Sequence, residues 1–180
     1  MRAGAGLPVR AAGPCRRGGR AAGAPRLSAP ADPAGLVDRV ERVFADVPRP
    51  DDEALLHPEC YDMGDLREVA AVRHWRDLAD ADVVSAYAAL AFLSPGGFRH
   101  YLPAFLRFVL RHPDSGEAVV DSTVWAFLPE LYREELRPFV RSKWTDLAGE
   151  ERDVVTAFLD VMTAHHDDAA AALAAWREAG

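Results

Sequence analysis

The sequence predicts an all-α protein, a single compact domain of about seven to eight helices with irregular orthogonal or bundle packing. Two patterns support this class. Apolar residues recur every three or four positions along most of the chain, which is the spacing of amphipathic helices. No segment alternates apolar and polar residues over a useful length, as a half-buried strand would. The 180 residues, 49% of them hydrophobic, are enough for one core.

Residues 1–35 are predicted to form a disordered tail in front of a helical domain at residues 36–180. The tail is nearly all Ala, Gly, Arg and Pro and has no aromatic residue. Such a segment cannot bury enough apolar surface to offset the entropy lost on folding. Three interpretations stay open: a basic arm for anionic partners, a transit-like presequence, or an N-terminal extension from a start codon assigned too early.

The first helix is expected from about Pro33 to Asp46. Asp32 is placed to cap it, and Pro33 suits its first position. Its apolar stripe consists of Leu36, Val37, Val40, Val43, Phe44 and Val47. A second helix is expected further on, around apolar residues at intervals of three, namely Leu66, Val69, Val72 and Trp75. A third begins near Asp80 or Asp82 and continues to Leu93, and its apolar surface on most sides predicts a central position.

An uninterrupted apolar stripe from Phe98 to Val109 contains Pro103. A proline inside a helix removes one backbone hydrogen bond and costs about 3 kcal/mol. We therefore expect a short helical turn over residues 95–101 and a longer helix that begins near Pro103. The later elements are a helix with Val120 and Val124 inward, a short helix at Glu130–Leu136, a connector at Phe139–Leu147, a helix at Val154–Met162 and a last helix at Asp168–Glu178.

The net charge of −7 hides an asymmetry between the tail and the domain. Residues 1–30 hold six arginines and no acid, so the remainder has 15 basic and 28 acidic residues, a net charge of about −13. Such a domain repels nucleic-acid phosphates and suits a partner protein with a basic surface. An acidic surface also simply keeps soluble proteins dispersed. No apolar run is long enough to span a membrane, and Cys15 and Cys60 indicate free thiols in the cytoplasm.

The segment Ala91–Leu106, which reads AFLSPGGFRHYLPAFL, resembles the mid-chain signature of an uncharacterised bacterial family, domain of unknown function 6714. Trp75 fits a tryptophan that precedes this signature, and residues 147–151 with Phe158 and Leu159 fit a later helix. The chain departs from the family at Ala148 and Glu151, where a capping Ser or Thr and a Gln are expected, which implies a weaker helix start. The resemblance covers residues 36–165 and implies no activity, cofactor or partner.

The densest group of candidate binding residues is Arg99, His100, Tyr101 and Arg107. If a helix begins at Pro103, its free N–H groups and these side chains together could hold an anion or a partner's carboxylate. The alternative is that Tyr101 belongs to the core, Arg99 pairs with an acid and His100 is solvated. We predict no catalytic residue and no cofactor, because no Walker loop, Rossmann glycine pattern or H-E-x-x-H motif is present.

Two histidine-containing segments do not favour metal binding. His165-His166-Asp167-Asp168 fits a helix end followed by a new cap, because adjacent helical side chains point about 100° apart. His57-Pro58-Glu59-Cys60 is at best half of a zinc site. The mixed charges from Glu134 to Lys143 are typical of a solvated face.

Three functions are consistent with these patterns. The leading one is a small acidic interaction or regulatory module, for which a toxin-neutralising, immunity-like role is one version by analogy. The second is a small-molecule or anion-binding protein, or an enzyme, with a pocket around the RHYLP segment. The third is a structural or oligomerising bundle with an exposed apolar patch. The sequence does not set the oligomeric state.

Overall fold

The computed structural model describes residues 32–57 and 66–179, and these residues form helices and no strand. The predicted all-α fold is confirmed. The α-helices are α1 (Pro33–Val43), α2 (Arg67–Ala71), α3 (Asp80–Ser85), α4 (Ala89–Phe92), α5 (Pro95–Arg111), α6 (Ala118–Trp125), α7 (Arg137–Ser142), α8 (Glu150–Met162) and α9 (Ala169–Glu178). Short 3-10 turns are η1 (Asp52–Ala54), η2 (Trp75–Asp77), η3 (Pro129–Leu131) and η4 (Glu134–Leu136). The predicted tail lies outside the described residues as far as residue 31.

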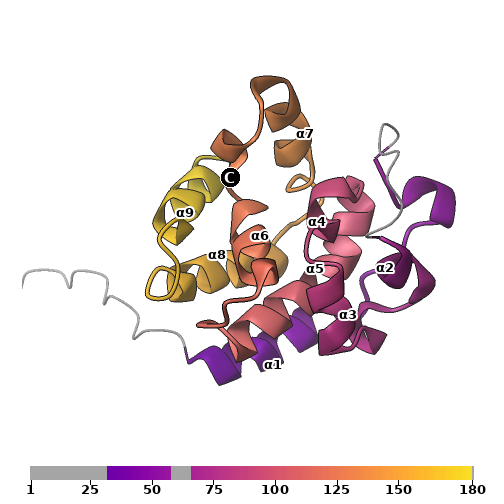
Figure 1. The fold of residues 1–180 in the computed structure, drawn as a ribbon, viewed down its shortest axis with the longest axis horizontal. Helices are drawn as coiled ribbons and strands as arrows, with labels where there is room; N and C mark the ends of the chain where they lie inside the picture. Colours follow the sequence, from indigo (N-terminus) through magenta and orange to yellow (C-terminus); the bar gives the residue numbers. More distant parts are fainter. Residues whose placement is uncertain (1–31, 58–65, 180) are drawn as a thin grey trace, which may run out of the picture.

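Helix α5 is the centre of the domain. From Gly97 to Leu110 every residue except Arg99 is buried, and α1, α3, α4, α6 and η2 all pack against this helix. Figure 1 shows α6, α8 and α9 on one side of α5 and α2 to α4 on the other. A helix that is apolar on nearly all sides belongs in a core, and here the rest of the chain surrounds it. No helix in the described part of the chain is long and apolar enough to cross a membrane.

The expected break in α5 at Pro103 is wrong, because one continuous helix runs through this residue. Ser94 caps the helix: its hydroxyl oxygen accepts from the Gly97 N–H at 3.1 Å and the hydroxyl donates to the Ala54 carbonyl at 2.7 Å. Pro103 leaves only the Arg99 carbonyl without its helical donor. Burial of the apolar residues on both sides of Pro103 offsets this loss.

Three further boundaries differ from the sequence expectations. The single helix expected to end at Leu93 is two helices, α3 and α4, and between them the Tyr87 carbonyl accepts a hydrogen bond from Ser122 at 2.6 Å. Trp75 lies in η2 and not in the second helix, while the expected connector holds α7. The cap of α1 is confirmed, because the Asp32 carboxylate accepts from the N–H groups of Ala34 and Gly35.

Gly97 is required where α5 begins. A Cβ atom at this position would lie 2.4 Å from the Leu55 carbonyl oxygen, which is fixed backbone, whereas the nearest atom to a Cβ on Gly96 lies at 3.8 Å. We expect Gly97→Ala to lower the free energy of unfolding by about 1–3 kcal/mol. Gly96→Ala, the matched control, should be neutral or stabilise by about 0.5 kcal/mol because alanine favours the helix. Urea unfolding of both variants tests this, and equal stability of the two would refute the close approach.

Candidate functional site

The four predicted binding residues all lie on α5, but their side chains go to different neighbours. Arg99, His100 and Tyr101 are successive residues, so the helix turns them about 100° apart. His100, Tyr101 and Arg107 are buried, and Arg99 is partly exposed. The structure therefore spreads this group around the central helix.

Arg99 forms a fork-shaped ion pair with Glu151 at the start of α8. Its Nε lies 3.1 and 3.0 Å from the two carboxylate oxygens, and Nη2 lies 2.9 Å from Oε1. The hydrogen bonds to Glu151 raise the pKa of Arg99. Glu151 also accepts from the Ala148 N–H at 3.3 Å, so this carboxylate supports the helix start where the family resemblance implies weakness. The expectation that Arg99 pairs with an acid is correct.

His100 is enclosed in the core with only 1% of its surface exposed. Its Nδ1 lies 2.9 Å from the Val47 carbonyl oxygen, which requires this nitrogen to be the N–H donor. Its Nε2 is buried and has no hydrogen-bond partner among the described residues. Burial lowers the pKa of His100, so the ring is neutral near pH 7. The expectation of a solvated His100 is wrong.

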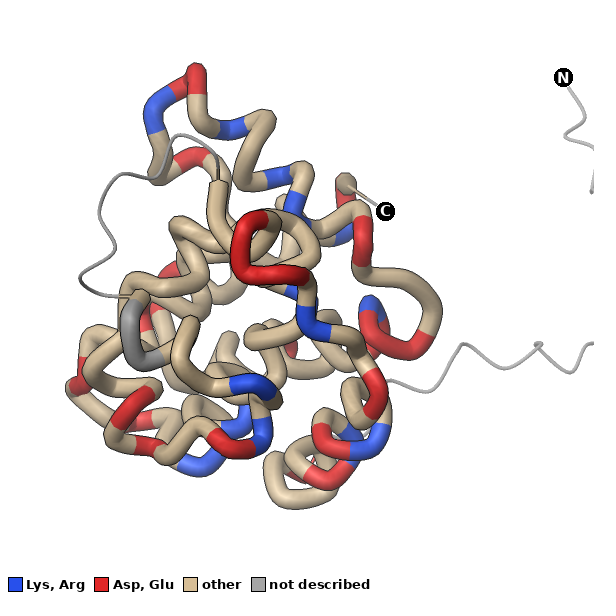
Figure 2. The backbone as a smooth tube through the Cα atoms, turned by 90° about the vertical axis from the view of Figure 1, so that its right-hand side faces the viewer, with Lys and Arg blue, Asp and Glu red and all other residues tan. Residues whose placement is uncertain are grey.

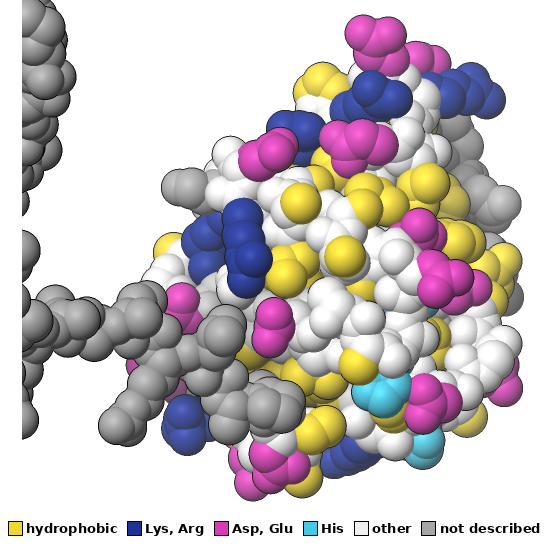
Figure 3. All heavy atoms as spheres, turned by 90° about the vertical axis from the view of Figure 1, so that its left-hand side faces the viewer, with side chains coloured by type: hydrophobic (Ala, Val, Ile, Leu, Met, Phe, Trp, Pro, Cys, Tyr) yellow, Lys and Arg dark blue, Asp and Glu magenta, His cyan; other side chains and the backbone are white. Residues whose placement is uncertain are grey.

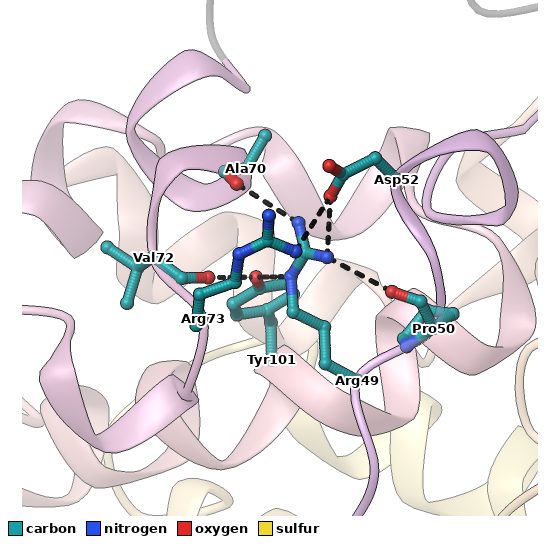
Figure 4. Close-up of polar contacts among 7 residues, drawn as sticks. All are labelled: Arg49, Pro50, Asp52, Ala70, Val72, Arg73 and Tyr101. Carbon is teal, nitrogen blue, oxygen red and sulfur yellow. Dashed lines mark hydrogen bonds and ion pairs between the residues drawn. The ribbon is translucent and has the colours of Figure 1, made fainter.

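Tyr101 joins a polar network centred on Arg49, which is drawn in Figure 4. The Arg49 Nε donates to the Tyr101 hydroxyl at 2.8 Å, and this hydroxyl donates in turn to the Val72 carbonyl. Arg49 also donates to the carbonyls of Ala70 at 3.0 Å and Pro50 at 3.1 Å. The network thus satisfies carbonyls at the end of α2. Burial raises the pKa of the Tyr101 hydroxyl.

Asp52 is the exposed end of this network. Its Oδ1 lies 2.6 Å from Nη1 of Arg49 and 3.5 Å from Nη1 of Arg73. The hydrogen bond from Arg49 lowers the pKa of the Asp52 carboxyl. The Arg49 side chain is only 7% exposed and bonds to Tyr101, Asp52 and two carbonyls, so it holds three segments of the chain together and itself offers little cationic surface. Arg73, at the outer end of the network, is exposed.

Arg107, further along α5, contacts the segment around η2. Its Nη2 donates to the Leu78 carbonyl at 2.9 Å, and its guanidinium lies 5.4 Å from the centre of the Trp75 ring. Burial is the main cause of a lowered pKa at Arg107. Its contacts are all internal, which suits a structural role at the end of η2.

Arg99 borders a hollow of about 330 Å³, whose other lining residues are Pro48, Arg49, Pro50, Asp51, Gly96 and Asp146. His100, Tyr101 and Arg107 are not among the described residues that line this hollow. The carboxylates of Asp51 and Asp146 oppose an anion there. The free helix start expected near Pro103 does not exist, because that residue is inside α5. A binding role for Arg99, His100, Tyr101 and Arg107 stays a prediction.

The histidine-rich segment after α8 makes separate pairs. His165 Nδ1 lies 2.8 Å from Asp114 Oδ1, and His166 Nε2 lies 3.1 Å from Asp121 Oδ1. Asp168 does not cap α9 with its side chain, as was expected of Asp167 or Asp168, because its carboxylate accepts from the Trp125 indole at 2.9 Å. In the described ranges, no three His, Cys, Asp or Glu residues are arranged to hold a metal ion.

The other two candidate segments differ in outcome. The His57 ring lies 3.9 Å from that of Phe139, while residues 58–60 lie outside the described part of the chain. In the mixed-charge segment, Arg141 pairs with Glu130 at 3.2 Å on the surface. Lys143, expected on the same solvated face, is instead buried and donates to the carbonyls of Leu90 at 2.8 Å and Ala91 at 2.6 Å.

Sequence reasoning missed Arg49 and Lys143 as internal cations. Arg49 lies between two prolines, and Lys143 lies beside Trp144. Neither pattern identifies a partner, since Arg49 meets Tyr101 52 positions away and Lys143 meets Leu90 53 positions away.

Residues 33–179 match the model of a family of unknown function, DUF6714. The chain belongs to this family. No curated protein and no solved structure matches the chain. In this DUF6714 chain the AFLSPGGFRHYLPAFL segment forms the end of α4, the cap at Ser94 and the first two thirds of α5. The family signature therefore coincides with the centre of the core.

The buried His100 makes stability depend on pH. The unfolded chain has an ordinary histidine pKa near 6.5 and the folded protein a lower one, so protonation favours the unfolded state. The free energy of unfolding should be unaffected by this group above pH 6.5. It should fall below that pH, by at most about 1.4 kcal/mol per pH unit, the limit for one proton.

The variant His100→Asn tests this dependence, because its amide can still donate near Val47 but does not titrate. We expect its unfolding free energy, measured by urea between pH 4.5 and 8, to decline less on acidification than that of the parent. Parallel curves for the two proteins would show that His100 does not titrate differently in the folded state.

Proposed function

We propose that this DUF6714 protein is an interaction module that binds a basic surface of a partner protein in the bacterial cytoplasm. The observation that carries the proposal is the distribution of charge. Four cations of the domain form internal contacts, while most of the acidic residues that the structure describes are exposed. This arrangement supports an electrostatic role for the surface.

The internal use of cations is specific. Arg49, Arg107 and Lys143 donate to backbone carbonyls, and Arg99 pairs with Glu151. Among the residues whose exposure the structure describes, the exposed basic side chains are Arg42, Arg73, Arg76, Arg111, Arg133, Arg141 and Arg177. Several of these are themselves paired, as Arg111 is with Glu41 and Arg141 with Glu130.

The exposed acids are more numerous and mostly unpaired. Among the described residues, the exposed acids outside the ion pairs include Asp38, Asp46, Asp51, Glu53, Asp77, Glu117, Glu134, Glu135, Glu150, Asp160, Asp167 and Glu178. Figures 2 and 3 show acidic residues on two opposite faces of the molecule. A negative field of this extent attracts a basic partner and opposes nucleic acid.

A toxin-neutralising, immunity-like protein is one form of this function, since masking a basic functional surface needs charge complementarity and no catalytic group. The anion-binding alternative has less support, because two carboxylates line the hollow beside Arg99. The two cysteines, of which Cys15 lies in the Arg-rich segment, favour the reducing cytoplasm as the place of action.

The test is affinity capture by the full chain from lysate of its natural host, followed by purified binary binding. We expect a partner with a basic surface whose association constant falls steeply, about tenfold or more, between 50 and 300 mM salt. Calorimetry with both purified proteins measures this. A partner whose affinity is independent of salt, or the recovery of no partner that binds in purified form, contradicts the proposal.

A further inference from the structure

A shallow hollow of about 390 Å³ lies beside the C-terminal end of α5, between α3 and the loop that precedes α6. Ala81, Val84 and Phe108 supply apolar walls. Asp80 and Glu117 place carboxylates at its rim. The hollow therefore combines an apolar interior with negative charge at its edge.

We propose that this hollow receives an arginine side chain of a partner protein, an inference that rests on the proposed function and assigns it a site. An arginine combines an apolar stem with a charged head, so the stem can contact Val84 and Phe108 while the head meets a carboxylate. The planar guanidinium can also lie against an aromatic ring and donate two parallel hydrogen bonds to one carboxylate. A lysine ammonium lacks both properties.

The carboxylate of Asp80 already lies near a nitrogen atom of the chain itself. His112 Nε2 lies 3.6 Å from Asp80 Oδ2, and both side chains are about half exposed, at 47% and 46%. This pair is long and solvated, so it is worth little. A guanidinium in the hollow can replace it with shorter, charge-assisted hydrogen bonds. Glu117 is exposed, and its carboxylate supplies a second acceptor at the hollow.

Two exposed aromatic side chains lie on the segments that flank the hollow. Tyr87 lies in the turn between α3 and α4, three residues after Val84, and is 44% exposed. The Tyr87 carbonyl accepts a hydrogen bond from Ser122 on α6. Trp125, three residues after Ser122, is 38% exposed, and its indole N–H donates to the carboxylate of Asp168. An anchored aromatic side chain at the surface loses little entropy on binding, which is typical of interface hot spots.

Charge complementarity favours a basic segment of another protein as the ligand of the hollow. A second copy of the domain would bring another net negative surface to the acidic rim, which is unfavourable. The arginines of residues 1–30 have the right chemistry, so the experiment distinguishes them from a partner.

The experiment uses amide NMR of the full chain and three synthetic peptides, Ac-Gly-Ala-X-Ala-Gly-amide, in which X is arginine, lysine or the neutral analogue citrulline. We expect the arginine peptide to shift the amide signals of Ala81, Val84 and Ser115, which line the hollow. The lysine peptide should shift them several-fold less, and the citrulline peptide should not shift them. Equal shifts with arginine and citrulline would overturn the proposal.

Two double variants that remove the same charge distinguish binding in the hollow from attraction by the overall negative charge of the domain. The double variant Asp80→Asn with Glu117→Gln should reduce the affinity of the domain for the arginine peptide at least about fivefold. The control Asp51→Asn with Glu150→Gln removes the same charge near the other end of α5, which is roughly 20 Å away, and should change the affinity less than about twofold.

The outcomes also separate this inference from the proposed function. If the two double variants weaken binding of the arginine peptide equally, the result would support attraction by the overall negative charge, as in the proposed function, and would overturn the hollow as a binding site. Replacement of the six arginines in residues 1–30 by glutamine tests the chain's own segment. If that replacement shifts the hollow's amide signals without any peptide, the occupant is that segment, and the assignment to a partner is overturned.

Discussion

The burial of α5 is the constraint on which the rest of the structure depends. Once this helix lies in the centre, each polar side chain on it must find an internal partner, because an unpaired buried polar group costs about 1–3 kcal/mol. Tyr101 meets this requirement by bonding the carbonyl of Val72, and Arg107 meets it in part through the bond from its Nη2 to the carbonyl of Leu78. Among the described residues, Arg107 Nε and His100 Nε2 are buried without a partner. The polar residues of α5 thus fix the positions of the elements around it.

The short helices create a second requirement that cations satisfy. Elements of three to six residues leave most of their carbonyls without helical donors, and several of these ends face the core. Two cations from distant parts of the chain supply the missing donors. Arg49 donates to a carbonyl of α2, and Lys143 donates to two carbonyls of α4. Positive charge used in this way is withdrawn from the surface of the domain.

Local patterns predicted much of the fold, and non-local contacts account for what was missed. Asp32 as a cap and the apolar stripe of α1 depend on residues within one or two turns, so the sequence alone reveals them. Pro103 misled the prediction because the helix propensity of one residue was weighed without the burial on both sides. The internal roles of His100 and Lys143 depend on carbonyls 53 positions away, which no spacing rule can locate.

The role of cations at buried helix ends is tested most directly at Lys143. Replacing it with methionine keeps an unbranched side chain that is one atom shorter but leaves the carbonyls of Leu90 and Ala91 without this donor. The account predicts that Lys143→Met lowers the free energy of unfolding by about 1–3 kcal/mol in urea, whereas the same replacement at the exposed Arg177 has almost no effect. A Lys143→Met protein as stable as the parent, or more stable, would contradict it.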